Sequence, residues 1–139
     1  MLLTKLIKMR LNRKYYMEDS ILNSVKKVLG IPKELDAFDE DILMNINSVF
    51  SILYQIGVQS SNDTYRIEDA EANWSDFFEE QTLCDMIKTY TYIKVRILFD
   101  PPTSSFVLES LKTQAQELEW RIHVQAEGGF KDAESESTE

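Results

Sequence analysis

The segment KVRILFDPPTSSFVLESL, Lys94 to Leu111, decides the fold, because it contains the end of one helix and the start of another. A proline disfavours helical backbone at the residue before it, so Pro101 and Pro102 end the first helix at Asp100. The Thr-Ser-Ser run at 103–105 offers three alternative N-caps for the next helix. We predict that this stiff corner of Asp100, Pro101 and Pro102 aims the second helix at a neighbouring protein.

The helix before the corner is predicted over residues 82–99, with apolar side chains around nearly its whole circumference. A helix that is apolar on all sides is buried, so this one is expected to be the centre of the domain. Thr82 and Asp85 resemble a capping box at its start, and Cys84 is expected inside as a small apolar filler. The core residues predicted on this helix are Tyr90, Ile93 and Ile97.

The helix after the corner carries two faces. Its apolar residues recur every three or four positions and, at 100° per residue, fall in a stripe of roughly 80°. This stripe contains Leu108, Leu111, Ala115, Leu118 and Ile122, of which Leu111 and Leu118 are predicted core residues. Trp120 lies opposite, so either the aromatic residues at 74–78 or another molecule must cover it. The interface candidates are Phe106, Thr113, Trp120, Arg121 and Val124.

Two further helices are predicted earlier in the chain. The first runs from about Glu18 and ends at Gly30, and the second begins within 36–41, contains the predicted core residues Ile46 and Phe50, and ends at Gly57. The acid cluster at the start of the second helix admits a metal site. The more economical interpretation is that anionic side chains favour the first turn of a helix. The cluster comprises Asp36, Asp39, Glu40 and Asp41.

Residues 58–72 show no helical stripe, and the alternation of Tyr65 and Ile67 with polar residues allows a short strand or hairpin. Three aromatic residues follow at 74–78 and are expected to close this loop over the core, unless they cover Trp120 instead. The predicted fold class is therefore all-α. We expect a compact bundle of about four helices, with a longer loop or small β-element between the second and third.

Charge is spread unevenly along the 139 residues, whose net charge is −9. Residues 1–14 carry +5, residues 127–139 carry −4, and the remainder carries −10. An acidic body repels phosphate, which suits solubility or DNA that slides past without sequence-specific binding. We expect a basic extension over 1–17, a helical domain over 18–125 and a disordered acidic tail over 126–139. The extension either contacts an acidic partner or membrane, or is leader translated upstream of a start at Met17.

Catalytic signatures are missing from the sequence. Cys84 and His123 are the only cysteine and histidine, and His123 is interpreted as an end-of-helix cation beside the helix dipole. Phosphate loops, nucleophile elbows and zinc spacings do not occur. We therefore expect neither an enzyme nor a cofactor or metal, and no apolar run approaches a membrane span.

The stretches FDEDILMNINSVFSILYQIGV, WSDF and KTYTYIKVRILFDPPTSSFVLESLKTQAQELEWRI together resemble the small head-tail connector proteins of tailed bacteriophages and prophages. These proteins are also described as head-completion, adaptor or DNA packaging proteins. The resemblance covers about residues 18–125 and is most specific from Tyr90 to Phe106 and at Glu119-Trp120-Arg121.

The resemblance implies a portal-binding adaptor, made in the host cytoplasm, that assembles as an oligomeric ring, a dodecamer, at the head-tail interface of the virion. Such a ring binds the portal protein through a C-terminal segment, lengthens the DNA channel and receives the stopper or tail-completion protein. The alternative function is an acidic inhibitor or DNA mimic that binds a host protein. Mimicry requires carboxylates in a row on a stable surface, whereas many acids here lie at helix starts and in the tail.

Overall fold

The computed structural model describes residues 2–4 and 19–128 and, within them, confirms an all-α fold. The four long helices are α2 (Ile21–Val28), α3 (Asp39–Gln55), α5 (Gln81–Phe99) and α6 (Ser105–Ala126), and the single-turn helix α4 (Trp74–Phe77) precedes α5. Most of the predicted basic extension and of the predicted acidic tail lies outside the described residues.

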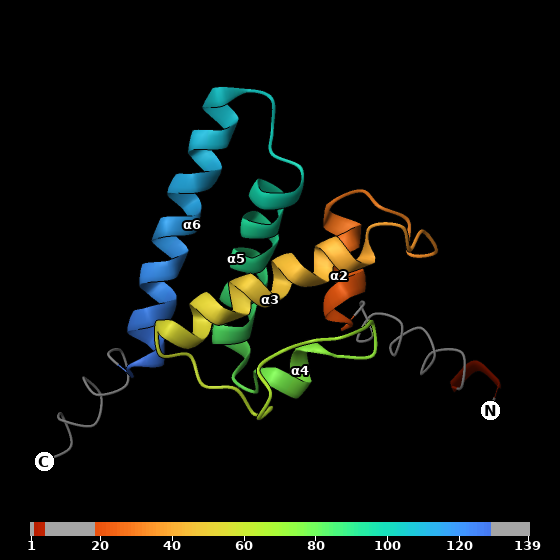
Figure 1. Ribbon diagram of the computed structural model, residues 1–139. Coiled ribbons are helices and arrows are strands. Elements are labelled where there is room, and N and C mark those ends of the chain that lie inside the picture. Colours follow the sequence, from red (N-terminus) through yellow and green to blue (C-terminus); the bar gives the residue numbers. More distant parts are fainter. Residues whose placement is uncertain (1, 5–18, 129–139) are drawn as a thin grey trace, which may run out of the picture.

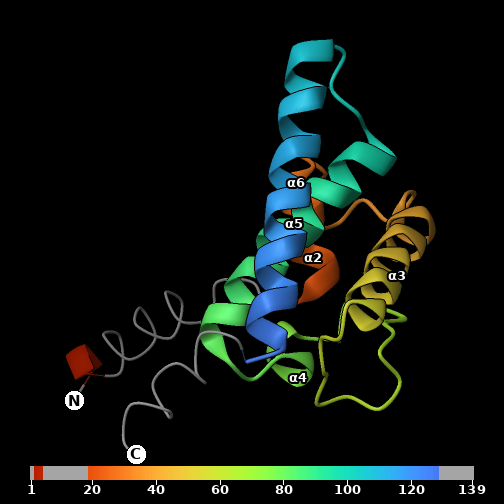
Figure 2. The ribbon, with the colours of Figure 1, turned by 90° about the vertical axis from the view of Figure 1, so that its left-hand side faces the viewer.

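Helix α5 is the central element. It forms an antiparallel hairpin with α6, α2 packs against it on the side away from α6, and α3 crosses its face (Figures 1 and 2). The corner end of this hairpin projects beyond the rest of the domain (Figure 1). In keeping with that projection, the only buried residues of α6 are Ala115 and Ile122, and neither lies among its first ten residues. Residues 105–114 of α6, here termed the spur, therefore contain no buried side chain.

The core is centred on Phe50 of α3. The ring centroids of Tyr65, Trp74, Phe77 and Phe78 lie 5.5 to 6.1 Å from that of Phe50. Such edge-on and tilted ring pairs add stability beyond the area that they bury. The aromatic residues at 74–78 thus close the preceding loop over the core and do not reach Trp120.

The predicted core residues fall into two groups. Ile46, Phe50 and Tyr90 are fully buried. A second group lies on the α5–α6 hairpin and is only half buried. It comprises Ile93, Ile97, Leu111 and Leu118. The expectation that α5 is buried all round is wrong at its last turn, where Leu98 is exposed.

The helix ends follow from local chemistry. Gly30 and Gly57 take φ of +75° and +95° just after α2 and α3, a conformation that costs glycine little. Ser104, from the three alternatives at 103–105, caps α6 by accepting a hydrogen bond from the Val107 N–H. The expected capping box at Thr82 is wrong. Glu80 caps α5 instead, because its carboxylate reaches two N–H groups of the first turn.

The segment between α3 and α4 is a loop, and the described residues contain no strand. Tyr65 has φ of +48°, which interrupts the alternation that suggested a strand. The backbone of Ile67 forms its hydrogen bonds with a side chain and not with a neighbouring strand. The side-chain amide of Asn47 donates to the carbonyl oxygen of Ile67 and accepts from its N–H, at 2.9 Å each. One isolated bridge, between Ser20 and Asn73, ties the end of this segment to the start of α2.

Candidate functional site

The corner between α5 and α6 is held from outside the hairpin. Asp100 ends α5 with its N–H still bonded to the carbonyl of Arg96, and the two prolines follow. The Phe99 ring packs edge-on against Phe38, with centroids 5.7 Å apart. Because Phe38 lies immediately before α3, this contact ties the end of α5 to the loop between α2 and α3.

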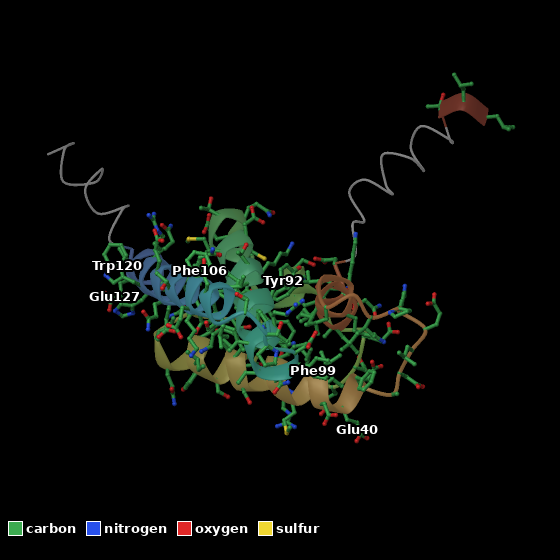
Figure 3. The ribbon with its side chains drawn as sticks, turned by 90° about the horizontal axis from the view of Figure 1, so that it is seen from above. Glu40, Tyr92, Phe99, Phe106, Trp120 and Glu127 are labelled. Carbon is green, nitrogen blue, oxygen red and sulfur yellow. The ribbon has the colours of Figure 1, made fainter. Side chains whose placement is uncertain are left out.

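The outer face of α6 carries the predicted interface residues and lacks cover in the described part of the chain. Trp120 is 61% exposed and Phe106 is 83% exposed. Thr113 and Arg121 are also exposed, whereas Val124 is half buried. Figure 3 shows Phe106 and Trp120 at opposite ends of α6. The structure thus brings these residues onto one helix, with an aromatic side chain toward each end.

A groove of about 400 Å³ lies beside Trp120, between the second half of α6 and the end of α3. The indole of Trp120 and the side chain of Ile56 supply its apolar surface. Amide and ionisable side chains supply the rest: Gln55, Gln116, Glu119 and His123. The sequence pattern did not predict this groove, because it depends on where the end of α3 meets α6.

Histidine 123 connects the two walls of the groove. Its Nδ1 lies 2.7 Å from the carbonyl oxygen of Ile56, to which it donates a hydrogen bond, and its Nε2 lies 3.3 Å from Glu127. The predicted end-of-helix position is thus observed, and the ring also anchors α6 to the end of α3. Cys84 is buried and is not among the groups that contact this imidazole.

The Tyr90–Glu119 pair fixes α6 on α5 next to the groove. The buried Tyr90 hydroxyl donates a 2.7 Å hydrogen bond to Glu119 Oε2. Burial raises the pKa of Tyr90 well above its usual range, and the hydrogen bond and negative charge of Glu119 add to this effect. The neutral phenol therefore acts as a stable donor that positions the carboxylate at the groove.

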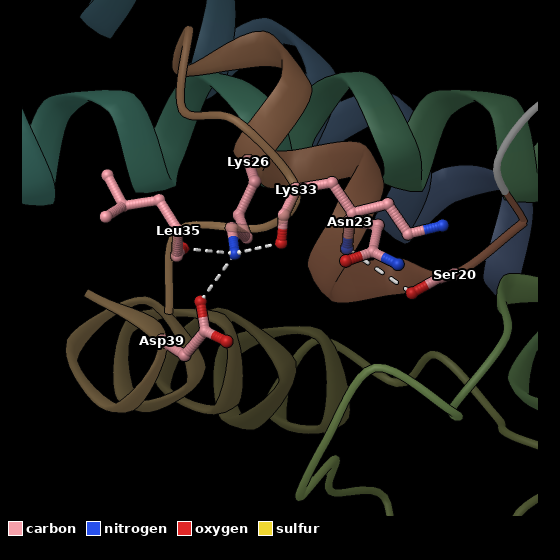
Figure 4. Close-up of polar contacts among 6 residues, drawn as sticks. All are labelled: Ser20, Asn23, Lys26, Lys33, Leu35 and Asp39. Carbon is pink, nitrogen blue, oxygen red and sulfur yellow. Dashed lines mark hydrogen bonds and ion pairs between the residues drawn. The ribbon is translucent and has the colours of Figure 1, made fainter. Parts of the chain in front are cut away.

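A buried lysine holds the loop beneath the corner, a feature that the sequence analysis missed. Lys26 is 1% exposed, and its Nζ lies 3.0 and 2.6 Å from the carbonyl oxygens of Lys33 and Leu35 and 2.8 Å from Asp39 Oδ1 (Figure 4). The signal was available, because Lys26 follows Leu22 by four residues and thus falls within the apolar stripe of α2. One ammonium group thus fixes residues 33–39 and, through Phe38, supports the corner.

The acid cluster at the start of α3 shows the arrangement expected for a helix terminus. The first turn contains Asp39, Glu40 and Asp41, and Asp39 also forms an ion pair with Lys26. Within residues 2–4 and 19–128, His, Cys, Asp and Glu form no group that could hold a metal ion. The described helices include none that is long and apolar enough to cross a membrane.

The geometry defines a helical protein whose α5–α6 hairpin projects from the domain (Figure 1). Residues 21–129 match the family described as phage connector protein, so the chain belongs to that family. Its role is that of a head-tail connector, and the family is structural and non-enzymatic. As a virion component, the chain interacts with other head or tail proteins of the phage. No curated protein and no solved structure matches the chain.

Proposed function

We propose that the chain is an adaptor that docks as a ring on the portal vertex. In this role it lengthens the DNA channel and joins the filled head to the stopper or tail-completion protein. The observation that carries the proposal is the uncovered outer face of α6, presented on a hairpin that projects from the domain (Figure 1). Large aromatic side chains in such positions are typical anchors of protein interfaces.

The corner supports the same proposal. Two consecutive prolines restrict the backbone between α5 and α6, and the Phe38–Phe99 contact fixes the end of α5 against the body. A stiff exit angle lowers the conformational entropy lost when α6 binds a partner. In a ring, the same small gain applies at every subunit and is multiplied by multivalency.

The net charge of the domain suits a channel wall. Residues 15–126 carry −10, so packaged DNA would be repelled and free to slide. We infer that the ring contacts DNA without sequence-specific binding. In this scheme residues 18–125 form the connector domain, 1–17 a separate extension and 126–139 an acidic tail with a docking role.

The test is complementation of a phage that lacks this gene with Trp120→Ala, Phe106→Ala and the double variant. Because both side chains are exposed, each purified variant should melt within about 2 °C of the parent, a shift equivalent to a few tenths of a kcal/mol. We expect the double variant to yield DNA-filled heads that lack tails and leak DNA. The matched control is Met44→Ala, another exposed apolar side chain, on α3.

Mass spectrometry of purified virions gives the copy number and tests the ring directly. A protein absent from virions, or infectious particles at the parental titre with the double variant, would contradict the proposal. Absence from virions combined with tight binding of a host protein would favour the inhibitor function instead.

A further inference from the structure

The basic extension is the sequence feature that the connector function leaves unused. The family match begins at residue 21, after this extension. Residues 1–14, here termed the basic arm, contain five basic side chains and no acidic one: Lys5, Lys8, Arg10, Arg13 and Lys14. Leu2, Leu3, Leu6 and Ile7 recur at the spacing of one helix face, and residues 2–4 are helical. A basic, amphipathic segment requires a surface that is apolar and acidic at once.

The groove beside Trp120 is such a surface. The exposed indole and Ile56 provide the apolar part, and Glu119 lines the same groove. Over residues 105–127, α6 and its cap carry four acidic side chains and two basic ones. Lysine and arginine stems pack along an indole while their charged ends reach nearby carboxylates. The groove thus offers an indole, an isoleucine and one carboxylate, on a helix with an excess of acidic side chains, to the apolar and basic residues of the arm.

The positions of the arm and the groove favour pairing between copies. The arm joins the domain at α2, whose first residue is Ile21, and α2 lies on the opposite side of α5 from α6 in both views (Figures 1 and 3). The attachment point and the groove are thus different surfaces on different sides of the domain. A contact between unlike surfaces of identical subunits is head-to-tail and closes into a ring when the rotation permits.

We propose that the basic arm of one copy binds the Trp120 groove of the next and thereby links neighbouring subunits. This inference rests on the proposed ring, for which it names one contact between copies. Phe106, at the other end of α6, remains available to the portal or tail protein. The arm acts as a strap whose apolar residues pack on Trp120 and whose basic residues pair with Glu119 and the neighbouring carboxylates of α6.

The first experiment measures binding of the arm. A fluorescein-labelled peptide of residues 1–16 is titrated with the full chain in which the five basic residues of the arm are replaced by glutamine, so that the groove is free. We expect saturable binding that weakens as salt rises. Adding Trp120→Ala should weaken it by roughly tenfold or more, whereas Phe106→Ala, the matched exposed aromatic on the same helix, should leave it unchanged.

Three results would overturn the proposal. In the first, the peptide does not bind the protein. In the second, it binds the Trp120→Ala protein as tightly as the protein that retains Trp120. In the third, it binds duplex DNA more tightly than it binds the protein. The second result would mean attraction by net charge alone, and the third would assign the arm to nucleic acid.

The second experiment asks whether the arm reaches another copy. Lys8→Cys in one full chain and Gln116→Cys in another are mixed in equal amounts under mild oxidation, with the buried Cys84 retained. We expect a disulfide-linked dimer of the two variants. A chain that carries both substitutions and, when dilute, forms only an internal disulfide would place the arm on its own groove and refute the link between copies.

The two proposals fail separately. If virions assemble normally with the glutamine-substituted arm, the strap is wrong while the connector function stands. If the protein is absent from virions but the arm still binds the groove between copies, the ring at the portal is wrong while the self-association stands.

Discussion

Replacing the buried Lys26 should destabilise the domain strongly. Lys26→Met keeps most of the side-chain volume but removes the ammonium group that bonds two carbonyl oxygens and Asp39. Breaking a buried ion pair by removing one partner costs about 3–5 kcal/mol. Asp39 remains 28% exposed and can recover water, so we expect the lower end, about 3 kcal/mol.

Thermal and urea unfolding followed by circular dichroism measure this effect. For a domain of this size, about 3 kcal/mol lowers Tm by roughly 10–15 °C. The matched control is Lys27→Met, its neighbour on the exposed side of α2, which should stay within about 0.5 kcal/mol of the parent. Replacing both partners, Lys26→Met with Asp39→Leu, should recover much of the loss, because no charge is left without its partner.

A Lys26→Met protein as stable as the Lys27→Met control would refute this reasoning. It would mean that the three oxygen atoms around Nζ are solvated equally well without it. A large loss that Asp39→Leu does not relieve would instead place the effect in the two carbonyl bonds alone.

Three other perturbations follow from the structure. Because the pKa of Tyr90 is raised in the folded state, the unfolded chain releases this proton first, so the free energy of unfolding should fall as pH rises above about 10. Urea titrations of Tyr90→Phe should show a smaller fall over the same pH range, and an unchanged fall would contradict this reasoning. Burial also raises the pKa of the Cys84 thiol, so its reaction with a thiol reagent at neutral pH should require unfolding, and stoichiometric labelling of the native protein would show an open site. Replacing both Pro101 and Pro102 by glycine should lower Tm by only a few degrees yet reduce incorporation into virions, and full incorporation would show that the exit angle of α6 is not used.

The sequence predicted the fold well where local chemistry is decisive. Proline and glycine end helices for reasons that act within a few residues, so the corner and the ends at Gly30 and Gly57 were placed correctly. Periodicity also identified the long helices. It could not tell that Leu98 is exposed and Ile97 only half buried. That outcome depends on relative helix lengths and crossing positions, which periodicity does not contain.

The candidate site was predicted in part. The outer face of α6 followed from the position of Trp120 opposite the apolar stripe, and its exposure depends on the aromatic residues at 74–78 packing around Phe50 instead. The groove and the Lys26 contacts join residues far apart in sequence or on different elements. Single-helix patterns carry no information about such partners, although a lysine inside an apolar stripe is a visible anomaly.

The uncovered outer face of α6 and the support of its corner belong to one arrangement. Helix α6 packs along α5 and buries Ala115 and Ile122, and further contacts at its two ends help to set its direction. At the corner, Lys26 fixes residues 33–39, the neighbouring Phe38 packs on Phe99, and the prolines follow. At the other end, His123 bonds the end of α3. We propose that a helix fixed at both ends and uncovered along its outer face would lose little conformational entropy on binding a partner, as the proposed connector function requires.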